Sequence, residues 1–196
     1  MEADNTKQTL PYPERVKARL RGFFDFDPVP PAFEGLVSSW AHFVQTDEKY
    51  FMSRKMNLYT VNAHRYIGLD ERDAVTREDL DRVFETLKAY ARAEGPGEQT
   101  MSTEYTVALI SRTAVSDETA AYLAKLKCQV GFAMGLKGWA DIGIVVADME
   151  NEKVYANPFG REQLQTTLWS FNDKPVIKPR GTWINKLKLL RCGCTG

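Results

Sequence analysis

Two thiols close to the end of the chain are the side chains with the clearest potential for chemistry. A single glycine separates Cys192 from Cys194, a spacing that allows two thiolates to chelate a soft metal or to form an easily reduced disulfide. A structural zinc site takes four ligands, and Cys128, His42 and His64 form no second paired motif. The pair supports one hypothesis, a thiol or metal protein in which Cys128 is a possible third ligand. The ordinary alternative is an unreactive chain end.

Basic side chains concentrate in two segments, near residues 15–21 and in the last 25 residues. The side chains that could contact an anionic partner there are Arg15, Lys17, Arg19, Arg21, Trp183, Lys186, Lys188 and Arg191. Nucleic-acid association is therefore a second hypothesis, although Lys plus Arg and Asp plus Glu both number 26 and a dedicated nucleic-acid protein usually carries a basic excess. The simpler interpretation of residues 182–191 is an amphipathic segment that covers its own domain or mediates assembly.

Local signatures of catalysis are missing from the sequence. It contains no GxSxG elbow and no recognisable surroundings for a catalytic cysteine. Glycines 131, 135, 138 and 143 fall within or between predicted strands, whereas a phosphate loop joins a strand to a helix. Acids at 141, 148, 150 and 152 and Lys153 invite a metal-dependent nuclease hypothesis, but Glu152 and Lys153 are adjacent instead of forming Glu-x-Lys. We therefore expect a non-catalytic protein, and the sequence implies no cofactor.

Composition is that of an ordinary globular domain. The 196 residues are 43% hydrophobic and 27% charged, and a chain of this length buries a sizeable core without staples. The first residues carry acids where a secretory signal carries bases, and no apolar run approaches the roughly 20 residues of a membrane span. Three cysteines without framework spacing suit a reducing compartment. We expect a cytoplasmic protein.

Hydrophobic periodicity predicts four helices and several strands. Apolar residues at helical spacing predict helices at 34–46, 77–91, 117–127 and 160–171, and Thr76 and Ser116 stand where N-caps are expected. Strand-like runs at 56–61 and 65–69 flank Asn62, Ala63 and His64, which predicts a hairpin. Residues 105–110 are apolar on both faces and predict a central strand. Residues 128–156 predict a meander of three strands.

These elements predict an α/β (α+β-like) fold with a central mixed sheet of five or six strands, antiparallel hairpins and about four packed helices. We divide the chain into an N-terminal arm with a short basic helix (1–31), a core domain (32–171) and a basic C-terminal tail with a short amphipathic segment (172–196). The function we favour is a ligand- or protein-binding module that self-associates as a homo-oligomer, with a protein or small molecule as partner.

Overall fold

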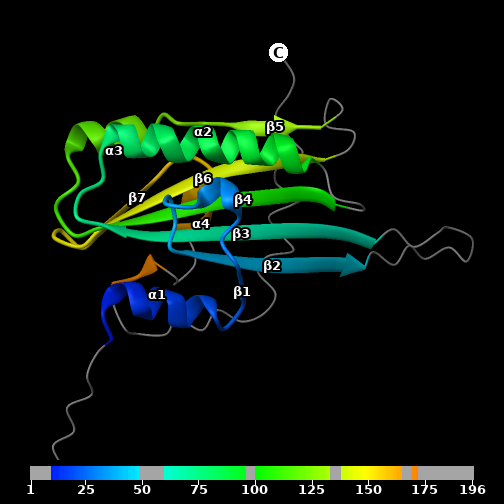
Figure 1. The fold of residues 1–196 in the computed structure, drawn as a ribbon, viewed down its shortest axis with the longest axis horizontal. Helices are drawn as coiled ribbons and strands as arrows, with labels where there is room; N and C mark the ends of the chain where they lie inside the picture. The colour runs from blue at the N-terminus through cyan, green and yellow to red at the C-terminus, as the bar shows by residue number, and fades with distance from the viewer. Residues whose placement is uncertain (1–9, 49–59, 96–99, 133–137, 165–168, 172–196) are drawn as a thin grey trace, which may run out of the picture.

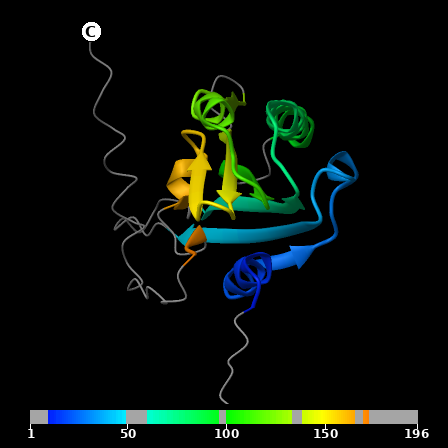
Figure 2. The same ribbon diagram turned by 90° about the vertical axis from the view of Figure 1, so that its left-hand side faces the viewer.

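A twisted mixed sheet runs through the middle of the molecule, with α2 and α3 on one face and α1 on the other (Figures 1 and 2). The computed structural model describes residues 10–48, 60–95, 100–132, 138–164 and 169–171. In chain order these residues form α1 (Tyr12–Leu20), β1 (Asp25–Asp27), the 3-10 turn η1 (Pro31–Phe33), β2 (Ser39–Glu48), β3 (Thr60–Arg72), α2 (Arg77–Glu94), β4 (Thr100–Ser111), α3 (Asp117–Leu123), β5 (Gln129–Gly131), β6 (Trp139–Asp148), β7 (Lys153–Ala156) and α4 (Gly160–Leu164).

Strand order in this seven-stranded sheet is β1-β2-β3-β4-β6-β5, and β7 also pairs with β6. The three central strands, β3, β4 and β6, are parallel, and every other pairing is antiparallel. Parallel neighbours need long crossovers, and α2 and α3 lie in these two crossovers. The described part of the chain therefore confirms the predicted α+β class, a single domain with a mixed sheet and four helices.

Successive side chains along the central strands point to opposite faces of the sheet, and this divides the core into two layers. On β4, Tyr105, Val107 and Leu109 pack towards α2 and α3, whereas Ala108 and Ile110 pack towards α1. The predicted central strand at 105–110 is thus confirmed, because both of its faces are buried. The side chains by which α1 packs on the sheet, Tyr12, Val16 and Leu20, are each at most 2% exposed. This helix and β1, which pairs with β2, both join the sheet domain.

The helix predicted at 77–91 is confirmed as α2. Thr76 accepts the amide of Asp79, and the Asp79 carboxylate accepts the amide of Thr76, which completes a capping box. Gly95, at φ 66°, ends the helix in a conformation that favours glycine. Ser116 caps α3 as predicted, although α3 ends at Leu123 and not at residue 127.

Several predicted elements are wrong. Residues 34–46 form no helix, because the residues from Ser39 onward belong to β2 and pair along their length with β3. Trp40 packs towards α2 and Ala41 towards α1, so the strand is apolar on both faces and its spacing imitates a helical stripe. The hairpin turn at 62–64 is also wrong. These residues lie inside β3, where the register with β4 shifts between Asn62 and Ala63.

The region after α3 forms the predicted strands in a different arrangement. β5 and β7 both pair with the same edge of β6, at its beginning and at its end, so they are not successive strands of a simple meander. The helix predicted at 160–171 ends at Leu164, within the described residues, and Trp169 and Phe171 pack in the core layer under α1. Of the strand predicted at 56–61, residues 56–59 lie outside the described residues and residues 60–61 belong to β3. The tail from residue 172 also lies outside the described residues.

Two similar turns follow the central strands β3 and β4. Residues 72–76 (Arg-Asp-Ala-Val-Thr) and 112–116 (Arg-Thr-Ala-Val-Ser) each lead from a strand into a capped helix. They lie side by side, because the amides of Arg112 and Thr113 donate to the carbonyls of Arg72 and Asp73 at 2.9 and 3.0 Å. The parallel pairing of β3 and β4 therefore continues into the turns and fixes the starts of α2 and α3.

Asp148 connects the end of β6 to the second of these turns. Its side chain is fully buried and accepts hydrogen bonds from the amides of Val115 (3.1 Å) and Asn151 (2.9 Å) and from the Asn151 side chain (3.0 Å). Burial alone would raise the pKa of Asp148, but these hydrogen bonds favour the carboxylate, and the resulting pKa lies below the ordinary value.

We expect Asp148→Asn to lower the free energy of unfolding by about 1–3 kcal/mol at pH 7, because a buried donor loses its acceptor. Since the folded pKa is lowered, the stabilisation by Asp148 is complete above about pH 4, the ordinary aspartate pKa, and is lost as the pH falls below it. The free energy of unfolding of the variant, measured with urea at several pH values, should therefore fall less steeply in acid than that of the wild type. Glu152→Gln, which changes an exposed acid near the same turn, is the control. If the free energy of unfolding falls equally steeply in acid in both variants, this role of Asp148 is contradicted.

Candidate functional site

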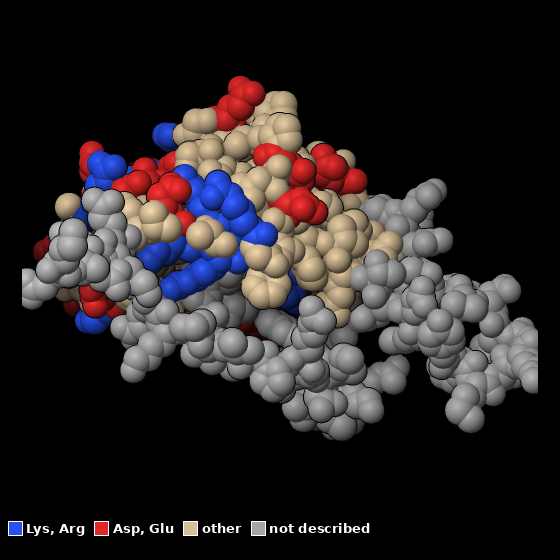
Figure 3. Space-filling model, turned by 90° about the horizontal axis from the view of Figure 1, so that it is seen from below, with Lys and Arg blue, Asp and Glu red and all other residues tan. Residues whose placement is uncertain are grey.

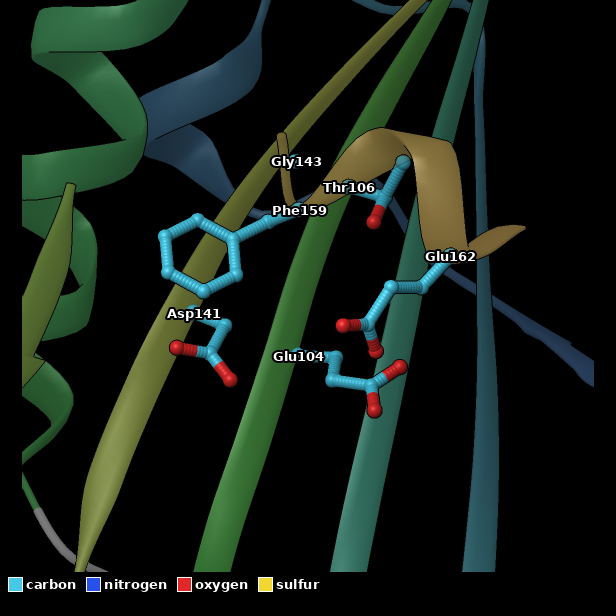
Figure 4. A pocket seen from close by; sticks show the side chains of 6 residues that line it. All are labelled: Glu104, Thr106, Asp141, Gly143, Phe159 and Glu162. Carbon is cyan, nitrogen blue, oxygen red and sulfur yellow. The ribbon is translucent and has the colours of Figure 1, made fainter. Parts of the chain in front are cut away.

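A small polar pocket lies on the α1-facing side of the sheet, between the sheet and α4 (Figure 4). β4, β6 and the α4 region each contribute two residues to it, which are Glu104, Thr106, Asp141, Gly143, Phe159 and Glu162. The cavity measures about 10 Å³, room for about one water molecule. Glu104 pairs directly with Asp141 across the two parallel strands, and Thr106 pairs with Gly143. These two register pairs form the floor of the pocket.

Asn157 holds the wall of the pocket in place. Between β5 and β7 the edge of β6 has no strand partner, and the fully buried Asn157 side chain fills this gap. It accepts the amide of Ile144 at 2.9 Å and donates to the carbonyl of Ile142 at 2.8 Å. Its oxygen also accepts the amide of Gly160 at 2.8 Å, which attaches the first residue of α4 to the sheet.

Two glycines permit this close approach. A Cβ on Gly143 would lie 2.6 Å from the Thr106 hydroxyl oxygen. A Cβ on Gly160 would lie 2.5 Å from the carbonyl oxygen of Ile144. Since real Cβ atoms do not approach so closely, any larger side chain would displace α4 or fill the pocket.

The three carboxylates of the pocket have different surroundings. Glu104 forms an ion pair with Arg65 of β3, with a distance of 3.0 Å from Arg65 Nε to Glu104 Oε2. Asp141 accepts a 2.6 Å hydrogen bond from the Gln129 side chain. Burial raises the pKa of Asp141, hydrogen bonds from Gln129 and Trp139 oppose the rise, and the charge of Glu162 adds to it. Asp141 therefore lies in an environment that favours compensation by a positive charge.

The shape and charge of the pocket suit a compact cation. Figure 4 shows the carboxylates of Glu104 and Glu162 near one another, while Asp141 lies on the other side of the pocket, on β6. An ammonium group is about as large as a water molecule and offers three N–H donors. Within the described ranges no three His, Cys, Asp or Glu side chains are arranged to hold a metal ion.

A larger hollow of about 460 Å³ lies near the N-termini of α2 and α3. Helix N-termini attract anions because their first amides lack partners. Here Thr76 and Ser116 already accept helix amides, and Glu78 and Glu118 add negative charge to the lining. The hollow is thus poorly suited to phosphate.

The basic residues predicted near the N-terminus lie on or directly after α1, where Figure 3 shows Lys and Arg side chains gathered. Arg15 donates to the carbonyl of Phe171 at 3.2 Å, and Arg19 donates to that of Ser170 at 2.6 Å. Lys17 bonds to Glu14 at 3.0 Å. Two of the four bases thus hold residues 170–171 against α1.

The fourth base, Arg21, lies over the Phe26 ring. The other predicted contacts, Trp183, Lys186, Lys188 and Arg191, and the predicted metal ligands Cys192 and Cys194, lie outside the described residues. Cys128 is half-buried directly before β5, and burial raises the pKa of its thiol.

Sequence reasoning missed the pocket as a site. It noted Asp141 only as a candidate nuclease ligand, and it did not consider Glu104 or Glu162. A signal was present, because Glu104 and Asp141 are acids inside runs of mostly uncharged residues that form buried strands. Their register, which makes them direct neighbours, follows from the tertiary pairing of β4 with β6.

Comparison with known proteins places this α+β domain in a family. Residues 8–167 match the family described as "Domain of unknown function (DUF8052)", and the chain belongs to that family. The match covers α1, the whole sheet and α4, and so includes every residue of the pocket. No curated protein and no solved structure gives a significant match. Among the described helices, none is long and apolar enough to cross a bilayer.

We expect Gly143→Ala to lower the free energy of unfolding by about 1–3 kcal/mol, because the new methyl group meets the Thr106 hydroxyl. The double variant Gly143→Ala/Thr106→Ala should recover much of this loss, since removing the hydroxyl frees the space that the methyl group needs. Thr106→Ala alone is the matched control, and chemical unfolding of all three variants gives the coupling energy. Additive effects of the two substitutions would contradict the close approach of β4, β6 and α4.

Proposed function

We propose that the protein is a non-catalytic cytoplasmic binding module, and that its pocket between β4, β6 and α4 binds a primary ammonium group of a small ligand or of a lysine on a protein partner. The observation that carries this proposal is that three acidic residues, from three different elements, line a cavity of about 10 Å³.

Size and donor count support an ammonium group over other cations. A guanidinium is a planar fork, larger than the cavity, whereas an ammonium carries its charge within the volume of a water molecule. Its N–H donors suit carboxylate acceptors, and three acidic residues, Glu104, Asp141 and Glu162, line the pocket. Arg65 already forms an ion pair with Glu104, so the two remaining carboxylates supply most of the attraction for a ligand.

Binding rather than catalysis fits the dimensions of the pocket. A reaction would need a substrate atom next to the acid and base groups, and the cavity has room for about one water molecule. A cationic head group entering from outside needs no more room than this. The ligand body would then lie on the surface beside α4.

The test is a titration of the full-length protein with methylammonium at pH 7, followed by amide chemical shifts. We expect saturable shifts at residues 104, 141, 143 and 160. Tetramethylammonium, which carries the same charge without N–H donors, should give none. Asp141→Asn and Glu162→Gln should each weaken binding at least fivefold, whereas Glu118→Gln, an exposed acid on α3, should have no effect.

The pH dependence of the same titration follows from Asp141. Because the pKa of Asp141 is raised, its carboxylate takes up a proton above the ordinary aspartate pKa of about 3.9. Affinity for methylammonium should therefore begin to fall before the pH reaches that value. Equal shifts with tetramethylammonium, or full binding by Asp141→Asn, would contradict an ammonium site.

We also propose that the module self-associates. This proposal is supported by large apolar side chains on the described surface, since Phe23 is 72% exposed and Leu10 is 55% exposed. Sedimentation of the wild type should show an oligomer, and Phe23→Ser should shift the equilibrium towards monomer. A wild type that sediments as a monomer at high micromolar concentration would contradict self-association.

A second candidate function is nucleic-acid association through the basic side chains gathered over α1 in Figure 3. Arg21 lies beside the exposed Phe23 and over Phe26, a combination that suits phosphate contact with base stacking. Binding of a labelled oligonucleotide should then weaken steeply with salt. No binding at low salt would exclude this function. Metal binding by Cys192 and Cys194 stays a prediction of the sequence.

A further inference from the structure

The chain has two histidines, and the sheet brings both together. His42 on β2 and His64 on β3 are diagonal neighbours, because His42 pairs with Tyr66 and Val44 pairs with His64. The Nε2 atom of His42 lies 3.1 Å from the Nδ1 atom of His64. The ring planes differ by only 8° and the ring centroids are 5.4 Å apart, so the two imidazoles meet edge to edge in a hydrogen bond.

The surroundings fix the position of the His42 ring. Tyr66 stacks on it, with ring centroids 4.3 Å apart and planes within 3°. The other ring nitrogen of His42, Nδ1, lies 3.8 Å from the carboxylate of Asp27 on β1. Asp27, His42 and His64 thus form a row across β1, β2 and β3. Titratable groups from the packed elements that face this row are Asp27 from β1, Tyr66 from β3, Tyr105 from β4, and Tyr90 and Glu94 from α2.

Proton counting shows why this row responds to pH. A hydrogen bond between two imidazoles needs one N–H and one lone pair at the facing nitrogens. The neutral pair meets this requirement. A pair with one extra proton on His42 also meets it, because Nε2 donates to His64 while Nδ1 faces Asp27. With a second extra proton both facing nitrogens carry a hydrogen. The hydrogen bond between the imidazoles is then lost, and two positively charged rings lie next to each other.

Burial, and then the charge of His42, lower the pKa of His64. This direction agrees with the proton count. A histidine whose folded pKa is lowered contributes stability that is complete above the ordinary value of about 6.5 and is lost as the pH falls below it.

We propose that His42 and His64 form a proton-sensitive latch, which holds the β2 edge of the sheet on β3 at neutral pH and loosens it in mild acid. The position supports this role. β1 pairs with Trp40, Ala41 and His42 only, so the histidine pair connects β2 to β3 at the point where β2 extends beyond β1. Opening the pair removes one of the side-chain contacts that hold this part of β2 to β3.

The first test is hydrogen exchange of the full-length protein at pH 7.5 and pH 5, corrected for intrinsic rates. We expect the amides of residues 41–45 to lose at least tenfold protection in acid. In His64→Asn this loss should disappear, because the Asn oxygen accepts from His42 near the position of Nδ1 but takes up no proton. Exchange in the buried strand β6 is the internal control and should be unchanged.

The second test is a ring-nitrogen NMR titration of the wild type, which remains informative even when a variant folds poorly. We expect the His64 ring to titrate below the ordinary histidine value of about 6.5. In His42→Gln, where the neighbouring charge is removed, the His64 step should move to higher pH. A His64 step at the ordinary value, a His64 step that is unchanged in His42→Gln, or equal acid exposure of β2 in wild type and His64→Asn would overturn the proposal.

Discussion

The register between β4 and β6 is the constraint on which the rest of this structure depends. Ten residue pairs align the two parallel strands, with Val107 opposite Ile144 under α2 and α3 and Ala108 opposite Val145 under α1. A slip by one residue would turn every apolar side chain to the wrong face, so burial on both sides fixes the register. The same register places Glu104 beside Asp141. Two acids that lie 37 positions apart in the sequence thus become neighbours because apolar residues further along the strands must be buried.

The pocket also depends on a local exception to regular pairing. The edge of β6 is covered by β5 and β7 except at its middle, and there the Asn157 side chain replaces a strand. Because the same side chain accepts the amide of Gly160, the start of α4 lies directly against the sheet. Glu162 is thereby brought to the two carboxylates of the strands. Closure of the sheet edge and formation of the pocket are therefore one event, which explains why Gly143 and Gly160 tolerate no side chain.

Features encoded by neighbouring residues could be predicted from the sequence, and features encoded by pairing could not. The capping box at Thr76 and the cap at Ser116 are local, and both helices start where the sequence placed them. β2 was predicted as a helix because a strand buried on both faces has no clear period of two. The pocket and the histidine pair depend on which strands are neighbours. The repeated Arg-x-Ala-Val-Thr/Ser turns are visible in the sequence, but their hydrogen bonds to one another follow only from the pairing of β3 with β4.

The central claim is that the pocket lined by Glu104, Asp141 and Glu162 binds an ammonium group, and the most direct measurement is a carboxyl carbon NMR titration of Asp141, with and without methylammonium. The account predicts that Asp141 titrates above the ordinary aspartate value of about 3.9 in the free protein. It also predicts that methylammonium moves this titration to lower pH, because a bound cation favours the carboxylate. An Asp141 that titrates at the ordinary value and does not respond to methylammonium would contradict the account.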